Sequence, residues 1–92
     1  MVTAFLQVIC EPGQIGAVGQ GLADTPGVAE VYTTTGPSDF IAIVRVADLD
    51  ELAELVTERI TTLAGVTRTS TAVAIRSYGR SDEAAAFDIG VD

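Results

Sequence analysis

Two segments of the chain, Val2 to Cys10 and Phe40 to Val46, are apolar at nearly every position. Such runs predict strands that are buried on both faces. Stretches rich in valine and threonine at 28–35 and 66–76 predict two more strands. The turn sequence Gly36-Pro37-Ser38-Asp39 separates the second strand from the third and predicts a hairpin.

An amphipathic segment follows the first strand and predicts a helix that begins near Pro12 and ends before Thr25-Pro26-Gly27. Three glycines in this helix weaken it, which suggests that they allow close packing against the sheet or a neighbour. Its expected apolar stripe consists of Ile15, Val18, Leu22 and Ala23, and the glycines are Gly16, Gly19 and Gly21.

A second helix is predicted to begin at Asp48, which acts as N-cap and forms a capping box with Glu51. Gly65 is expected to stop it. The apolar stripe predicted for this helix consists of Leu49, Leu52, Val56, Ile60 and Leu63.

The order of elements is therefore β-α-β-β-α-β. With short loops and right-handed crossovers, this order predicts an α+β, ferredoxin-like fold, a four-stranded antiparallel sheet with two helices on one face. The other face would be bare, yet its strands are apolar on both sides. We therefore expect a second copy of the chain to cover it.

Composition divides the chain into a domain at 1–77 and a C-terminal tail at 78–92. The length of 92 residues suffices for one core and not for two. The tail is predicted to form a short helix or a docking arm, in which Phe87 and Ile89 pack on a neighbouring subunit, or else a frayed terminus.

The charge balance argues against direct binding of nucleic acid. Thirteen acidic residues face five arginines, with no lysine or histidine, and the net charge is −8. Such a surface repels phosphate backbones. No apolar run is long enough for a membrane helix and no signal peptide is present, so we expect no membrane association and a cytoplasmic location.

Catalytic and metal-binding patterns are missing from the sequence. Cys10 is the only cysteine and is expected to pack in the core, so no metal site is predicted. The carboxylates on the second helix are typical of a solvated face, and no glycine-rich phosphate loop occurs. We therefore expect no cofactor and no enzymatic activity.

Two polar segments at strand ends are the candidate binding residues. The hairpin turn 36–39 offers backbone groups and the Asp39 carboxylate, and Thr67 to Thr71 offers hydroxyl groups. Facing one another, they would suit a zwitterionic amino acid. Ordinary turn propensity and β-propensity explain the same residues without a ligand.

Several motifs in order resemble the ligand-binding domain of the Lrp/AsnC feast/famine regulators over about residues 2 to 76. They are Gly27-Val28, Gly36-x-x-Asp39, Asp48-Leu49-Asp50-Glu51-Leu52 and Gly65-Val66-x-Arg68-Thr69-x-Thr71. The usual N-terminal helix-turn-helix is absent, so the chain looks like a stand-alone form of the domain. The family often has an aromatic residue where this chain has Ser38.

The resemblance implies a dimer formed through the open sheet faces, and dimers assembled into an octamer or similar ring. It also implies an amino acid or similar effector bound between dimers, and a full-length Lrp/AsnC regulator as a further partner. The binding residues implied are Gly36, Pro37, Ser38, Asp39, Thr69, Ser70 and Thr71.

Two other hypotheses remain at this point. One is a small dimeric α+β-barrel enzyme, such as a cofactor-free monooxygenase, in which Tyr32, Asp39 and Tyr78 are the only candidate acid–base groups. The other is a structural subunit with a vestigial pocket.

Overall fold

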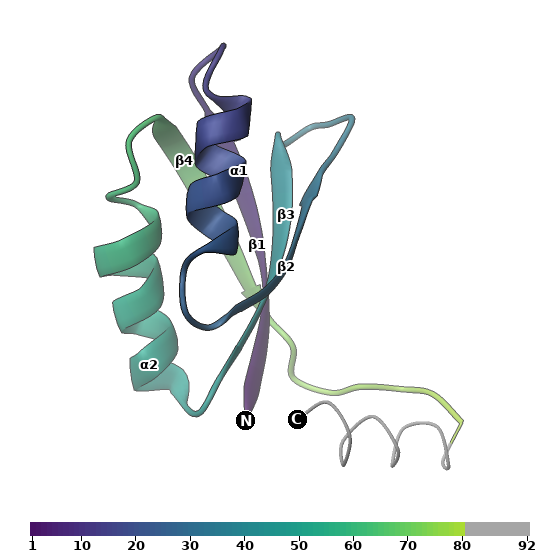
Figure 1. Ribbon diagram of the computed structural model, residues 1–92. Helices are drawn as coiled ribbons and strands as arrows, with labels where there is room; N and C mark the ends of the chain where they lie inside the picture. The colour runs from purple at the N-terminus through teal and green to yellow at the C-terminus, as the bar shows by residue number, and fades with distance from the viewer. Residues whose placement is uncertain (81–92) are drawn as a thin grey trace.

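The computed structural model describes residues 1–80, in the predicted order of elements (Figure 1). The α+β, ferredoxin-like prediction is confirmed: one four-stranded antiparallel sheet carries both helices. The elements are β1 (Val2–Cys10), α1 (Ile15–Ala23), β2 (Val28–Thr33), β3 (Phe40–Val46), α2 (Leu49–Glu54), the π-helical segment η1 (Leu55–Ile60) and β4 (Val66–Val73).

The two apolar strands lie at the centre of the sheet, whose order is β2-β3-β1-β4. The β1–β3 ladder runs from the pair Val2 and Val46 to the pair Val8 and Phe40. Both edges of each central strand are paired, so its backbone groups are satisfied within the sheet. The β1–β4 ladder shifts by one residue at a bulge between Ile9 and Cys10.

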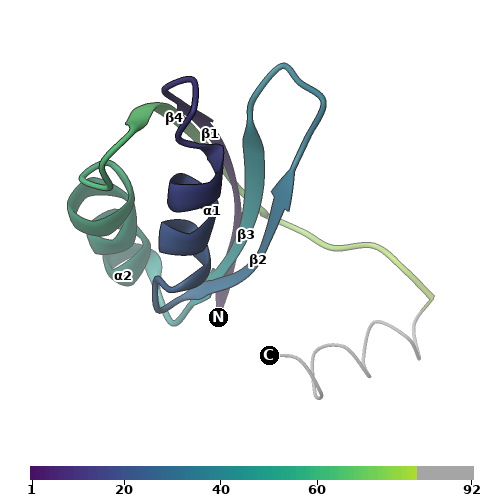
Figure 2. The same cartoon turned by 45° about the horizontal axis from the view of Figure 1, so that its top comes forward.

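Both helices lie on the same side of the sheet (Figures 1 and 2). We call this the covered face and the opposite side the open face. Alternate residues of β1 and β3 point to the covered face and are buried there. The buried apolar residues are Ala4, Leu6, Val8, Cys10, Val18, Leu22, Phe40, Ala42, Val44, Val46, Leu52, Leu55 and Ile60.

Helix α1 begins at Ile15, so Pro12 lies in the preceding turn and not in the helix as predicted. Two of its glycines lie where a side chain would collide with the core. A Cβ at Gly19 would lie 3.1 Å from the Phe40 ring, and one at Gly21 would lie 3.2 Å from the Leu63 side chain. Close packing therefore explains these two glycines.

The second helix has the predicted cap. The Asp48 carboxylate accepts a hydrogen bond from the Glu51 amide at 2.8 Å, and the Glu51 carboxylate accepts one from the Ala47 amide at 2.9 Å. The predicted apolar stripe was partly wrong, because Leu49 is 62 % exposed and Leu55 is buried instead. Leu55 and Ile60 are five residues apart, and the π-helical turn between them brings both to the core.

Two strands are shorter than predicted. β2 ends at Thr33, which pairs with the first residue of β3, and the Thr34 amide then bonds to the Asp39 carbonyl in the turn. β4 ends at Val73, and the Ala74 amide makes one more bond to the Thr3 carbonyl. Its neighbour β1 begins at Val2, so residues of β4 beyond Ala74 would have almost no strand to pair with.

Within residues 1–80, no helix is long and apolar enough to cross a membrane. The tail predicted at 78–92 lies mostly outside the described residues, and so do Phe87 and Ile89.

Candidate functional site

The hairpin turn between β2 and β3 is held by its own polar groups. The Thr34 hydroxyl donates to the Ser38 carbonyl at 2.6 Å. Ser38 is buried, and its hydroxyl donates to the Phe40 carbonyl at 3.2 Å. Gly36 has a φ of +131°, which favours glycine at this position. The turn is thus a defined structure and not a loose loop.

Asp39 joins this turn to the end of β1. Its carboxylate accepts a hydrogen bond from the Cys10 amide at 2.9 Å, and its own amide donates to the Val8 carbonyl at 3.0 Å. The Cys10 amide lies at the β1 bulge, where the regular ladder is interrupted. Asp39 therefore satisfies a backbone donor that the sheet leaves without a ladder partner.

The same contact affects the cysteine. Burial, and after it the negative charge and hydrogen bond of Asp39, raises the pKa of the Cys10 thiol above its ordinary value. A thiol in this state is protonated at neutral pH and unreactive. This agrees with the predicted packing role of Cys10, which is buried in the core.

A hollow of about 220 Å³ lies beside the turn, and we call it the hairpin hollow. Four of the predicted binding residues line it, two from the turn and two from β4. Gly36, Asp39 and Thr71 are not among its lining residues. The lining consists of Gln7, Ile9, Pro37, Ser38, Arg68, Thr69 and Ser70.

Strand pairing explains why the predicted binding residues of β4 point to different faces of the sheet. Ser70 pairs with Gln7, on the open face, whereas Thr71 pairs with the buried Leu6, on the covered face. Paired residues share a face and successive residues alternate. The side chains of Thr69, Ser70 and Thr71 therefore do not all point into one site.

The sequence-based prediction missed three lining residues: Gln7, Ile9 and Arg68. Arg68 pairs with Ile9 in the ladder, two residues from Ser70. Residues two apart on a strand share a face, so Arg68 lies on the same face as Ser70, and their partners Ile9 and Gln7 on β1 lie there too. This alternation of faces was the signal that would have found the three residues.

Three polar side chains of the hairpin hollow are available to a ligand. The side chains of Gln7, Arg68 and Ser70 make no hydrogen bond or ion pair with the rest of residues 1–80. Arg68 adds a guanidinium with five N–H donors, a group that binds carboxylates in a two-point geometry. The lining supplies one cation and no carboxylate.

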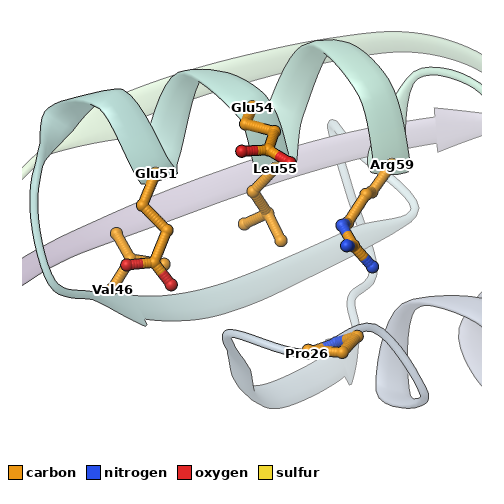
Figure 3. Close-up of a pocket in the computed structure, with 6 residues that line it drawn as sticks. All are labelled: Pro26, Val46, Glu51, Glu54, Leu55 and Arg59. Carbon is orange, nitrogen blue, oxygen red and sulfur yellow. The ribbon is translucent and has the colours of Figure 1, made fainter.

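A second hollow, of about 310 Å³, lies at the opposite end of the sheet, between the second helix and the loop after α1 (Figure 3). We call it the helix hollow. Its charged residues are Glu51, Glu54 and Arg59, and Glu51 already caps the helix. Residues 1–80 hold no group of three or more metal-binding side chains.

The open face is apolar across its middle. Phe5 is 43 % exposed, and Ile41 and Ile43 are partly exposed. Tyr32 and Glu30 lie at its β2 edge, and the Tyr32 hydroxyl donates to the Glu30 carboxylate, which raises the pKa of Tyr32. The acid–base candidates of the enzyme hypothesis, Tyr32, Asp39 and Tyr78, line neither hollow.

Residues 3–84 match the family model of the Lrp/AsnC ligand binding domain. Among curated proteins, the HTH-type transcriptional regulator FL11 of Pyrococcus horikoshii is 30% identical over 80 residues, which is 87% of this chain and 52% of the relative. The chain thus spans about half the length of the curated relatives it matches.

Solved structures extend the comparison. TTHA0845 from Thermus thermophilus is 45% identical, with a TM-score of 0.83, over 87% of this chain and 100% of the other. A feast or famine regulatory protein from M. tuberculosis, complexed with L-methionine, is 26% identical, with a TM-score of 0.74, over 88% of this chain and 54% of the other.

Proposed function

The chain belongs to the Lrp/AsnC ligand-binding domain family, and from this premise we propose that it is an effector-binding and oligomerisation module, acting by binding and not by catalysis. Its effector is an amino acid or a similar small molecule. The match to TTHA0845 over the full length of that chain supports a role for the domain without an attached DNA-binding domain.

The hairpin hollow carries this proposal, because it joins an unpaired cation to neutral polar groups. Arg68 would bind the carboxylate of the effector, and Gln7 and Ser70 would hydrogen bond to its remaining polar atoms. The L-methionine complex of the M. tuberculosis relative supports an amino acid as ligand class. Asp39 would act on the site indirectly, by holding the turn in place.

The open face supports the oligomeric part of the proposal. A second copy would cover Phe5, Ile41 and Ile43, and so remove apolar surface from water. Gln7, Ile9, Arg68 and Ser70 lie on the same face. Further subunits would therefore add walls to a hollow that is small for a ligand site, where about 300 Å³ is a common lower bound. Dimers would assemble further into an octamer or similar ring.

The partner of such a module is a full-length Lrp/AsnC regulator. The curated relatives are transcriptional regulators about twice as long as the matched region. A module whose open face resembles that of the regulator's own ligand-binding domain would join the regulator's assembly. It would thereby change the regulator's response to the effector. Direct DNA binding is not expected at a net charge of −8.

Calorimetric titration with a panel of free amino acids, beginning with L-methionine, tests the proposal. Arg68→Gln removes the proposed carboxylate partner, and Arg59→Gln, in the helix hollow, is the matched control with the same change of charge. We expect Arg68→Gln to weaken binding by about 1.5 to 3 kcal/mol, roughly ten-fold or more. Arg59→Gln should bind like the wild type.

Two results would contradict the proposal. If no amino acid binds the wild-type protein, the effector class is wrong. If both variants lose affinity equally, the effect comes from net charge and not from the hairpin hollow.

A further inference from the structure

The segment that follows β4, residues 74–80, presents apolar side chains to solvent, and we call it the arm. Ile75 is 97% exposed and Tyr78 is 86% exposed. The Ala74 amide, bonded to the Thr3 carbonyl, makes the last backbone hydrogen bond to the sheet within residues 1–80. Large apolar side chains that remain this exposed are a sign of a surface that another molecule covers.

The direction of the arm indicates where that molecule lies. In Figures 1 and 2 the arm runs away from both helices and past the uncovered side of the sheet. A second copy placed against the open face would therefore meet it. The apolar residues of the open face, Phe5, Ile41 and Ile43, offer the arm a surface of matching chemistry.

Charge is compatible with the same partner. Residues 1–73 contain nine acidic residues and three arginines, and the arm contains Arg76 and Arg80. A second copy is as acidic as the arm's own chain, so it does not repel the arginines of the arm.

We propose that the arm of each copy packs against the open-face side of the other copy, so that two arms clasp the dimer. Ile75 and Tyr78 are the anchors of this contact, because aromatic and aliphatic side chains supply most of the contact area in such interfaces. The inference rests on the proposed dimer through the open face, and adds to it a segment outside the sheet.

Photo-crosslinking from the arm tests the contact directly. A full-length chain with a benzophenone amino acid at position 75 is mixed with nitrogen-15-labelled wild-type chain, allowed to exchange, and irradiated. We expect mixed-mass cross-links to peptides that contain residues 2–10 or 40–46 of the labelled copy. Cross-links only to the chain's own peptides, or to α1 and α2 of the other copy, would overturn the proposal.

The dissociation constant of the dimer is the second readout, measured by sedimentation equilibrium. The double variant Ile75→Ser/Tyr78→Ser should raise it at least about a hundred-fold, because two buried side chains are lost on each arm. Leu49→Ser is the matched control: it also removes an exposed apolar side chain, away from the open face. Circular dichroism checks that each variant is folded.

The outcomes separate the two proposals. A wild-type dimer whose affinity survives the double variant overturns the arm contact and leaves the open-face dimer intact. A wild-type protein that is monomeric overturns both.

Discussion

The two faces of the sheet are built from the same strands and differ in what covers them. Leu6 is fully buried beneath the helices, whereas the adjacent Phe5 is 43% exposed on the open face. Both are large and apolar, so hydrophobicity alone does not distinguish them. The difference comes from α1 and α2, which cover only one side of the sheet.

This contrast separates the causes of folding from those of assembly. Side chains on the covered face stabilise the single chain, because they leave water when it folds. In the proposed dimer, side chains on the open face contribute fully only when the second copy covers them. The hairpin hollow lies on the open face, so the proposed ligand site would belong with that assembly and not with the core.

Substitutions of the neighbouring residues Leu6 and Phe5 should show the largest difference between the covered face and the open face. Leu6→Ala should lower the free energy of unfolding by about 2 to 5 kcal/mol, because it leaves a cavity in the core. Phe5→Ala should leave each chain folded and weaken self-association instead. Urea denaturation at several protein concentrations distinguishes the two, since only a change in association depends on concentration. Equal, concentration-independent losses would contradict the division of roles.

Asp39 connects the core strand β1 to the turn beside the hairpin hollow. Asp39→Ala should destabilise the chain by about 1.5 to 3 kcal/mol, since the Cys10 amide loses a charged hydrogen-bond acceptor. Thermal denaturation measures this, and Asp39→Asn, which keeps an acceptor oxygen, should recover part of the loss. Unchanged stability in Asp39→Ala would show that the contact does not hold the turn.

Substitution of a glycine by alanine should change stability in opposite directions at a glycine packed against the core and at one with open space around it. Gly65 has a φ of +96°, and a Cβ there would lie 3.0 Å from a Val18 methyl group. Gly65→Ala should therefore lower the free energy of unfolding by at least about 1 to 2 kcal/mol. Gly16→Ala is the control: nothing lies within 4 Å, and the helix should gain up to about 1 kcal/mol. Chemical denaturation of both variants checks the opposite signs.

The smallest expected effect is on the pH dependence of stability. Burial and Asp39 raise the pKa of Cys10 in the folded chain above the ordinary 9.0. The stability that this thiol contributes is therefore complete below about pH 9.0 and is lost as the pH rises through the folded-state pKa. Cys10→Ala should lack this loss. Parallel decline of both proteins between about pH 8 and 11 would contradict the assignment.

Much of the fold could be predicted from the sequence, because its signals are local. The bounds of β1 and β3 were predicted to the residue, since each is an apolar run that ends where polar or turn residues begin. The cap at Asp48 followed from its spacing to Glu51. The π-helical turn was not predictable in this way, because the spacing of Leu55 and Ile60 fits no α-helical stripe.

The candidate site was harder to predict, because it depends on which strands are neighbours. Pro37 and Ser70 were predicted from turn chemistry and hydroxyl content, and both line the hairpin hollow. Arg68 and Gln7 become neighbours of Ser70 only through the pairing of β1 with β4 and the alternation of faces. Neither the register nor the free state of the Arg68 guanidinium is a property of one segment.

The mass of the protein in solution tests most directly the claim that a second copy covers the open face. Sedimentation equilibrium should show the wild type as a dimer, or a multiple of it, at micromolar concentration. Ile43→Glu, which places a charge in the middle of that face, should give a folded monomer, since a buried unpaired charge is costly. Leu49→Glu, away from the face, should keep the wild-type mass. A wild-type protein that is a folded monomer, or an Ile43→Glu variant with the wild-type mass, would contradict the account.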